Sequence, residues 1–180
     1  MPVHDDEPPD ALLARAYARH RRTVEEDLLT QLRAVSPERF ESIVIEVLVA
    51  MGYGGSFAEA AERIGRSGDG GIDGLIKEDR LGLDVVCVQA KRWADTVGRP
   101  TVQAFAGSLQ GARARKGILI TTSKFSNEAI DFAERIDTRI VLINGQNLVR
   151  YMFEHEVGVT TLKDQVYAVK RIDEDFFEDD

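Results

Sequence analysis

The sequence has a single cysteine, three scattered histidines and no apolar run near the roughly 20 residues of a membrane span. Cys87 has no partner for a disulfide within the chain, and His4, His20 and His155 lack the close spacing of a zinc site. The acidic first residues are not followed by the apolar stretch of a secretory signal. These absences exclude disulfide-stapled and zinc-nucleated folds, and they predict a cytoplasmic protein that does not enter the membrane.

The net charge of −8 is concentrated at the two ends of the chain. Residues 1–35 carry five Lys and Arg against seven Asp and Glu, and residues 161–180 carry three against seven. Residues 91–124 reverse this balance, with seven basic side chains against Asp95 alone. A local positive field can bind phosphates even in an acidic protein. Basic side chains on solvated helix faces give the same pattern, so charge alone leaves both interpretations open.

Two helices are predicted in the first third of the chain. Residues 10–34 contain no Gly or Pro, and their apolar side chains recur every three or four residues. This spacing predicts an amphipathic helix, with a single break left open. Ser36 is a good N-cap and Pro37 suits the first helical position, so a second helix begins there. Gly52 ends it.

The rest of the pattern alternates between strands and helices. After a glycine-rich region, two β-branched segments separated by a short turn predict a hairpin, and further buried strands follow with a helix between each. This order predicts an α/β fold with a central mixed sheet flanked by helices. The expected strands are 72–76, 84–91, 117–122 and 140–143, and the expected helices are 57–64, 100–112, 126–134 and 147–155.

A chain of 180 residues with 43% apolar composition can bury one substantial core. The composition shifts at both ends divide it into three parts. The parts are an N-terminal helical extension over 1–35, a domain over 36–160, and a C-terminal strand with an acidic tail over 161–180. The tail either stays solvated or docks Phe176 and Phe177 on the domain or on a second copy.

Four side chains are candidates for one reactive site. Asp73 begins the first strand of the expected hairpin, and Gln89 and Lys91 lie two apart near the end of the second, so both project from one face. Hairpin pairing brings the start of one strand beside the end of the other. Glu41 on the second helix is the leading further carboxylate. Glu46, about 500° further round that helix, does not share its face.

These side chains suit metal-dependent hydrolysis of phosphodiesters. Carboxylate and carbonyl-type oxygens are the ligands that Mg²⁺ prefers, and the ion activates both phosphate and water. A nearby lysine offsets negative charge in the transition state or orients the nucleophile. A glycine-flanked Asp73 facing solvent is the simpler interpretation, but its pairing with Gln89 and Lys91 favours a site.

The order of several motifs resembles the catalytic domain of Mrr-type restriction endonucleases, within the PD-(D/E)xK nuclease superfamily. The resemblance covers roughly residues 36–177. Its motifs are Phe40-Glu41, Met51-Gly52-Tyr53, Gly68-Asp69-Gly70-Gly71-Ile72-Asp73-Gly74, Gln89-Ala90-Lys91-Arg92-Trp93, Gln103-Ala104-Phe105, Lys116 to Ser123, Ile143-Asn144-Gly145 and Val157-Gly158-Val159.

The resemblance implies a restriction-endonuclease-like fold and assigns roles to the four candidates. Asp73 matches the metal-binding aspartate, Lys91 the catalytic lysine, and Glu41 the helical glutamate. Gln89 stands where most of the superfamily has Glu or Asp, so it supplies an oxygen without charge. Expected metal ligands are therefore Asp73, Glu41 and Gln89, with Mg²⁺ as cofactor and Mn²⁺ as a substitute.

DNA contacts are expected outside these four residues. Gln103 matches a polar position near the site, and hydroxyls at Thr121 to Ser123 either bind phosphate or cap the next helix. Trp93 either stacks on a base or sugar, or fills a gap after the strand. The full set of expected DNA contacts is Gln103, Arg92, Lys116, Ser123 and Lys124.

The expected function is a Mg²⁺-dependent DNA endonuclease that restricts foreign or modified DNA. Two alternatives stay open: a structure-selective repair or junction nuclease, and a non-catalytic DNA-binding or assembly subunit. About 35 residues precede the domain, fewer than the DNA-reading domain usual in the family, so a partner protein is one expected source of specificity. Cutting both strands predicts a homodimer or higher oligomer, with the apolar stripe of 10–34 as its interface.

Overall fold

The computed structural model describes residues 8–53, 72–77 and 85–162. No helix within these ranges is long and apolar enough to cross a membrane. Predictions for the short helix over 57–64 and for the strand and tail beyond residue 162 lie outside the described residues.

The two N-terminal helices form as the sequence predicts. α1 runs from Pro9–Ala34 without interruption, so the break left open in it does not occur. α2 covers Pro37–Ala50, and the Ser36 hydroxyl caps it by accepting the N–H of Arg39. Gly52 follows with φ of +97°, a left-handed conformation that glycine adopts without strain and that ends the helix.

The central sheet is mixed, which confirms the predicted fold class. Its four strands lie side by side in chain order. The first pairs antiparallel with the second as a hairpin, and the remaining pairs are parallel. The strands are β1 (Gly74–Lys77), β2 (Val85–Lys91), β3 (Lys116–Thr121) and β4 (Arg139–Ile143).

Three helices connect or follow the parallel strands. α4 (Arg99–Gly111) joins β2 to β3, and α5 (Asn127–Arg135) joins β3 to β4 with Ser126 as its cap. α6 (Gly145–Glu154) begins two residues earlier than predicted. The reason is Asn144, whose Oδ1 accepts the N–H of Asn147 and so starts the helix directly after β4.

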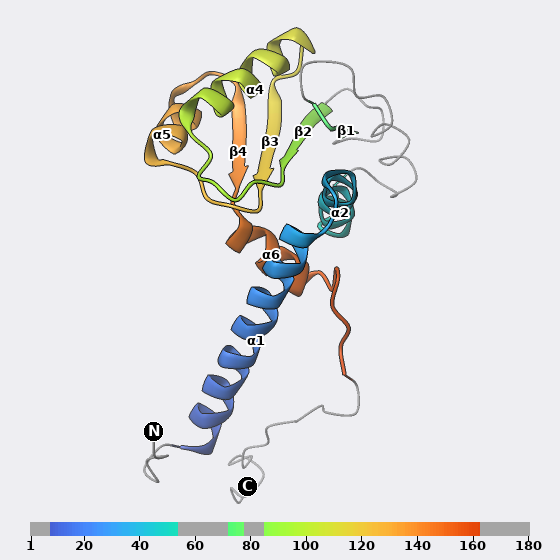
Figure 1. Cartoon of the computed structure of the whole chain (residues 1–180), viewed down its shortest axis with the longest axis vertical. Helices are drawn as coiled ribbons and strands as arrows, with labels where there is room; N and C mark the ends of the chain where they lie inside the picture. The colour runs from blue at the N-terminus through green and yellow to red at the C-terminus, as the bar shows by residue number, and fades with distance from the viewer. Residues whose placement is uncertain (1–7, 54–71, 78–84, 163–180) are drawn as a thin grey trace, which may run out of the picture.

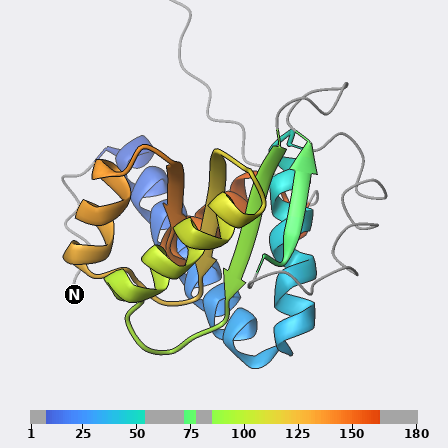
Figure 2. The ribbon, with the colours of Figure 1, turned by 90° about the horizontal axis from the view of Figure 1, so that it is seen from above.

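Helices cover both faces of the sheet (Figures 1 and 2). Alternate side chains of each strand point to opposite faces, so the sheet contributes to two apolar clusters. One cluster joins Val86, Val88 and Ala90 to α1, α2 and α6, and the other joins Cys87 and Leu119 to α4 and α5. In this three-layer arrangement, polar side chains gather at the ends of the strands.

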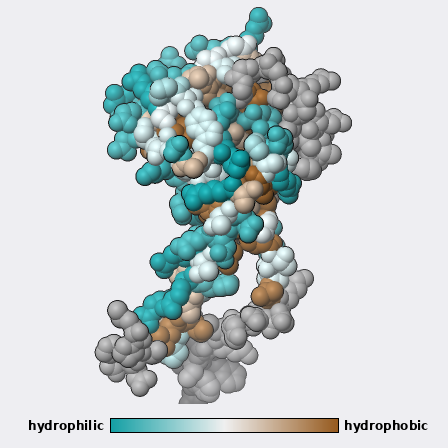
Figure 3. Space-filling model, in the orientation of Figure 1, coloured by the Kyte–Doolittle hydropathy of each residue, from teal (hydrophilic) through white to brown (hydrophobic). Residues whose placement is uncertain are grey.

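α1 packs on α6 with its second half and extends beyond the domain with its first (Figure 1). Leu28, Leu29 and Leu32 are buried, and Arg21 forms an ion pair with Glu154 at 2.8 Å. Beyond that ion pair, the side chains of the first turns are mostly exposed. Figure 3 shows apolar atoms gathered at this protruding end of the molecule.

Gly117 tests the packing of β3 against α4. A Cβ at this position would lie 2.7 Å from Leu109 Cδ1 and 2.8 Å from the ring of Phe105. We expect Gly117→Ala to lower the free energy of unfolding by about 1–3 kcal/mol, because buried neighbours must shift. Urea denaturation followed by circular dichroism measures it.

Gly107, exposed within α4, provides the matched control. A new Cβ there meets nothing within 4 Å. Gly107→Ala is expected to raise stability by about 0.5–1 kcal/mol, since alanine favours the helix. Equal stability of the two variants would contradict the described contact between β3 and α4.

Candidate active site

The start of β1 and the end of β2 bring Asp73 and Gln89 together. The Asp73 N–H donates to the Val88 carbonyl at 2.9 Å, one residue before the paired positions Gly74 and Val88. The Ala90 N–H in turn donates to Asp73 Oδ2 at 2.7 Å. The carboxylate is therefore fixed against the backbone of β2, in the position opposite Gln89 that the hairpin prediction required.

Gln89 and Lys91 project from the same face of β2. Gln89 is only 5% exposed, while Lys91 is half-buried at the carboxyl end of the strand, paired with Thr121. Cys87 occupies the same face and packs under α4. The strand thus emerges from the apolar core through Gln89 and presents the Lys91 ammonium at the sheet edge.

α2 brings Glu41 to this edge through a close approach at Gly74. A Cβ on Gly74 would lie 3.0 Å from Ile45 Cδ1, so the absent side chain lets the helix sit directly on β1. Glu41 lies four residues, about 6 Å along the helix, before Ile45, and Asp73 directly precedes Gly74. Figure 2 shows α2 running alongside β1. The helical and strand carboxylates are therefore neighbours.

The electrostatics of the site reflect this proximity. Burial raises the pKa of Glu41, and the charges of Asp73 and Glu38 raise it further, while Lys91 lowers it. Burial also raises the pKa of Asp73, against the opposing effects of the Ala90 N–H and of Lys91. Two partly buried carboxylates that repel each other beside one ammonium form a place where a cation is favourable.

The donor set fits a hard cation held largely by water and few protein oxygens. No group of three or more His, Cys, Asp and Glu suitable for a metal occurs among residues 8–53, 72–77 and 85–162. Glu41 and Asp73 supply two carboxylates, and Gln89 supplies an amide oxygen instead of a third. Mg²⁺ prefers such oxygen ligands and keeps several waters, so the residues present fit this ion.

Comparison with known proteins identifies the family to which the chain belongs. A family model described as restriction endonuclease, the Mrr catalytic domain, matches residues 32–152, about two thirds of the chain. This chain is a member of the Mrr restriction endonuclease family. The match confirms the resemblance predicted from the motifs and includes all four candidate residues.

One relative and two solved structures extend this comparison. The chain is 48% identical over 170 residues to the Type IV methyl-directed restriction enzyme EcoKMrr of Escherichia coli (strain K12). That match covers 94% of the chain, most of α1 included, but 54% of the relative, so the chain spans about half the relative's length.

The solved structures support the restriction-endonuclease fold. The chain resembles the MspJI restriction endonuclease in complex with a 27-mer oligonucleotide, with a TM-score of 0.53 and 25% identity over 72% of this chain and 31% of that one. It also resembles the DNA modification-dependent restriction endonuclease AspBHI, with a TM-score of 0.57 and 19% identity over 76% and 36% of the two chains.

Arg92 connects the end of β2 to the junction of α1 and α2 by a hydrogen bond. Its Nη1 donates to the Arg33 carbonyl at 2.8 Å, at the end of α1, and Arg33 Nη2 donates to the Thr122 carbonyl at 3.3 Å. The Arg92 Nε is buried without a hydrogen-bond partner among the described residues. This structural role was not anticipated from the sequence, and a DNA contact by Arg92 stays a prediction.

Three consecutive side-chain hydroxyls donate hydrogen bonds to the backbone at the end of β2 and in the segment that follows it. Thr121 Oγ1 donates to the Lys91 carbonyl, Thr122 Oγ1 to the Trp93 carbonyl and Ser123 Oγ to the Ala94 carbonyl, at 2.8, 2.8 and 3.0 Å. The alternative that these residues cap the next helix is wrong, because Ser126 caps α5. The run of three hydroxyl residues at the end of a strand is the sequence feature that could have predicted these hydrogen bonds.

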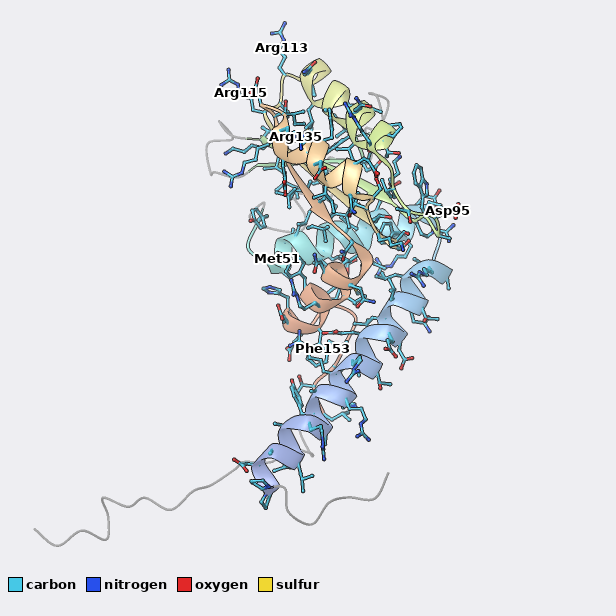
Figure 4. All side chains as sticks on the ribbon, turned by 90° about the vertical axis from the view of Figure 1, so that its left-hand side faces the viewer. Met51, Asp95, Arg113, Arg115, Arg135 and Phe153 are labelled. Atoms are coloured by element: carbon cyan, nitrogen blue, oxygen red, sulfur yellow. The ribbon has the colours of Figure 1, made fainter. Side chains whose placement is uncertain are left out.

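The basic stretch over 91–124 divides between opposite ends of the sheet. Lys116 pairs with Val86, whereas the carboxyl end of β3, Thr121, lies five residues away, about 16 Å along the strand. Figure 4 shows Arg113 and Arg115 at that remote end. Lys116 therefore lies at the opposite end of β3 from Ser123 and Lys124, and its contact with DNA stays a prediction. A count of charges along the sequence does not show that the length of β3 separates Lys116 from Lys124.

The remaining predicted DNA contacts are exposed. Lys124 follows β3 at the carboxyl end, where its carbonyl accepts the Val97 N–H at 2.8 Å. Gln103 lies on the exposed side of α4. Their contacts with DNA stay predictions.

Thr122→Val tests the hydrogen bonds of the three hydroxyls. Thr122 is 1% exposed, and the substitution keeps its shape while leaving the Trp93 carbonyl without its donor. We expect the free energy of unfolding to fall by about 1–3 kcal/mol, measured in urea. Thr30→Val is the control, because its hydroxyl bonds within exposed α1, and it should cost less than about 0.5 kcal/mol. A Thr122→Val chain as stable as the control would refute this role.

Proposed function

We propose that this chain hydrolyses phosphodiester bonds in DNA with the help of Mg²⁺, as a restriction-type endonuclease. The observation that carries the proposal is the meeting of Glu41, Asp73, Gln89 and Lys91 at one edge of the sheet in a restriction-endonuclease fold. The matched proteins add support: EcoKMrr is a restriction enzyme, and the MspJI structure is a complex with an oligonucleotide. We further propose that the chain acts in the cytoplasm, where cellular DNA is accessible.

Glu41, Asp73 and the amide oxygen of Gln89 would hold the cation, with Mn²⁺ able to replace Mg²⁺. When bound, the ion polarises the scissile phosphate and makes water a better nucleophile. Because Gln89 carries no charge, affinity for the ion depends on the two carboxylates. Burial raises the pKa of both carboxylates, and the charge of Asp73 raises that of Glu41 further, so a divalent cation is favourable at this place.

The other groups of the site orient and stabilise. The Ala90 N–H holds Asp73 Oδ2, so this carboxylate does not need to be ordered when substrate arrives. The Lys91 ammonium, half-buried at the end of β2, offsets the negative charge that grows on the phosphate oxygens. The Gln89 side chain is almost wholly buried beside Asp73.

Plasmid cleavage tests the site. Supercoiled DNA incubated with the chain and Mg²⁺ should become nicked or linear, and chelation by EDTA should stop the reaction. Asp73→Asn keeps an oxygen for the Ala90 N–H but removes the charge, and Lys91→Ala removes the ammonium. Each is expected to slow cleavage by about 10²-fold or more, as in the loss of other transition-state contacts.

Glu41 and Glu46 provide a matched pair on one helix. Glu46 forms an ion pair with Arg39 at 2.8 Å, whereas the charge of Asp73 raises the pKa of Glu41. Glu41→Gln should therefore slow cleavage strongly, and Glu46→Gln should leave it within about twofold of the parent. Cleavage that survives Asp73→Asn and Lys91→Ala would eliminate the proposed site.

We propose that two copies act together, since both strands of a duplex must be cut. The first half of α1 is the candidate interface. Leu13 and Tyr17 are 46% and 60% exposed and continue the face that Arg21 and Leu28 present to the domain.

Light scattering checks the proposed dimer. The parent chain is expected to have twice the monomer mass, and the double substitution Leu13→Asp with Tyr17→Asp should yield monomers. Ala18→Asp, about 100° round the helix from Tyr17, is the control and should leave the dimer intact. A parent chain that is monomeric at micromolar concentration yet cuts both strands would contradict the proposal.

A further inference from the structure

Trp93, the only tryptophan of the chain, stays 43% exposed at the end of the candidate site. A tryptophan chosen for stability is usually buried, because its large ring contributes most when it is removed from water. Trp93 instead follows Lys91 by two residues on the segment that leaves β2. The other interpretation, that Trp93 fills a gap after the strand, does not account for the exposed part of the ring.

The exposure does not arise from a loose segment. The backbone N–H of Trp93 donates to the Lys91 carbonyl at 2.9 Å, and the backbone carbonyl of Trp93 accepts the Thr122 hydroxyl at 2.8 Å. Lys91 and Ala94, on either side, are held by the hydroxyls of Thr121 and Ser123. The backbone of an exposed aromatic residue is thus fixed from both sides, which lowers the entropic cost of using its ring for binding.

The indole lies beside the ammonium that the proposed function assigns to the substrate phosphate. Lys91 Nζ is 5.8 Å from the centre of the Trp93 ring, a cation–π contact. A phosphate that hydrogen-bonds to this ammonium is about 3 Å from Nζ. The sugar and base attached to that phosphate then lie within reach of the exposed part of the indole.

We propose that Trp93 binds DNA directly, by stacking on the base or deoxyribose of a nucleotide next to the phosphate held by Lys91. The assignment rests on the proposed function, because that function places phosphate at Lys91. Aromatic stacking is tolerant of sequence, since every base has a π-face. Trp93 therefore contributes affinity and positions the scissile strand without selecting a base.

The single tryptophan makes the contact measurable by fluorescence. An Asp73→Asn chain is titrated in EDTA with a 20-base-pair duplex and, separately, with one strand of it, so that no cleavage occurs. Stacking should quench the indole emission as DNA binds. Anisotropy of a dye-labelled duplex gives the affinity in the same titration for chains with and without Trp93.

Substitutions separate stacking from other roles of the ring. Trp93→Ala should bind DNA about tenfold more weakly, in line with the typical contribution of one aromatic stack, and Trp93→Phe should recover most of the loss. In cleavage assays KM should rise more than kcat falls. Ile130→Ala, on α5 and also 40% exposed, is the control and should bind as the parent does. Circular dichroism confirms that each variant is folded.

Each outcome bears on the proposal separately from the proposed function. DNA binding without quenching, and with unchanged affinity of Trp93→Ala, overturns the contact alone. A lower kcat with unchanged KM also overturns it, because Trp93 would then position Lys91 rather than touch DNA. Quenching and weakened binding in a chain that cuts nothing support the contact and refute hydrolysis. A parent chain that binds no DNA refutes both.

Discussion

The antiparallel pairing of β1 with β2 is the interaction on which the candidate site depends. It sets Asp73 opposite Gln89 and directs the Ala90 N–H to the Asp73 carboxylate at 2.7 Å. The same hairpin places Gly74 beneath Ile45 of α2. Because glycine has no side chain, α2 sits on β1 closely enough to bring Glu41 to the same end of the strands. A slip of one residue in this register would turn Asp73 to the other face and separate the charged groups.

A second set of contacts fixes the edge where these groups meet. The end of α1 is bonded to the ends of β2 and β3 through Arg92 and Arg33, and the hydroxyls of Thr121 to Ser123 hold the chain after β2. These bonds join the end of α1 to the carboxyl ends of β2 and β3. Rigid support of this kind keeps two repelling carboxylates and an ammonium in place before any ligand binds.

Much of this arrangement follows from the sequence alone. The Ser36 cap, the β-branched strands and the spacing of Gln89 and Lys91 predicted the second helix, the mixed sheet and the hairpin that carries Asp73. The Mrr family motifs predicted the membership that the family match confirms. Local patterns of this kind depend on neighbouring residues, which a sequence shows directly.

Features that depend on residues far apart in the chain were not predicted. The bond from Arg92 to Arg33 spans 59 positions, and the position of Lys116 at the remote end of the sheet depends on the pairing of β2 with β3. Ser123 was assigned to DNA or to a helix cap because its partner, the Ala94 carbonyl, cannot be identified without the fold. Tertiary pairing decides such roles, and local pattern does not.

The central claim is that Glu41 and Asp73 together hold one divalent cation beside Lys91. Calorimetric titration with Mn²⁺ in the absence of DNA tests it most directly. The account predicts one ion per chain, lost in Asp73→Asn, weakened in Glu41→Gln and unchanged in Glu46→Gln. Binding of Mn²⁺ by Asp73→Asn as tight as that of the parent chain would contradict it.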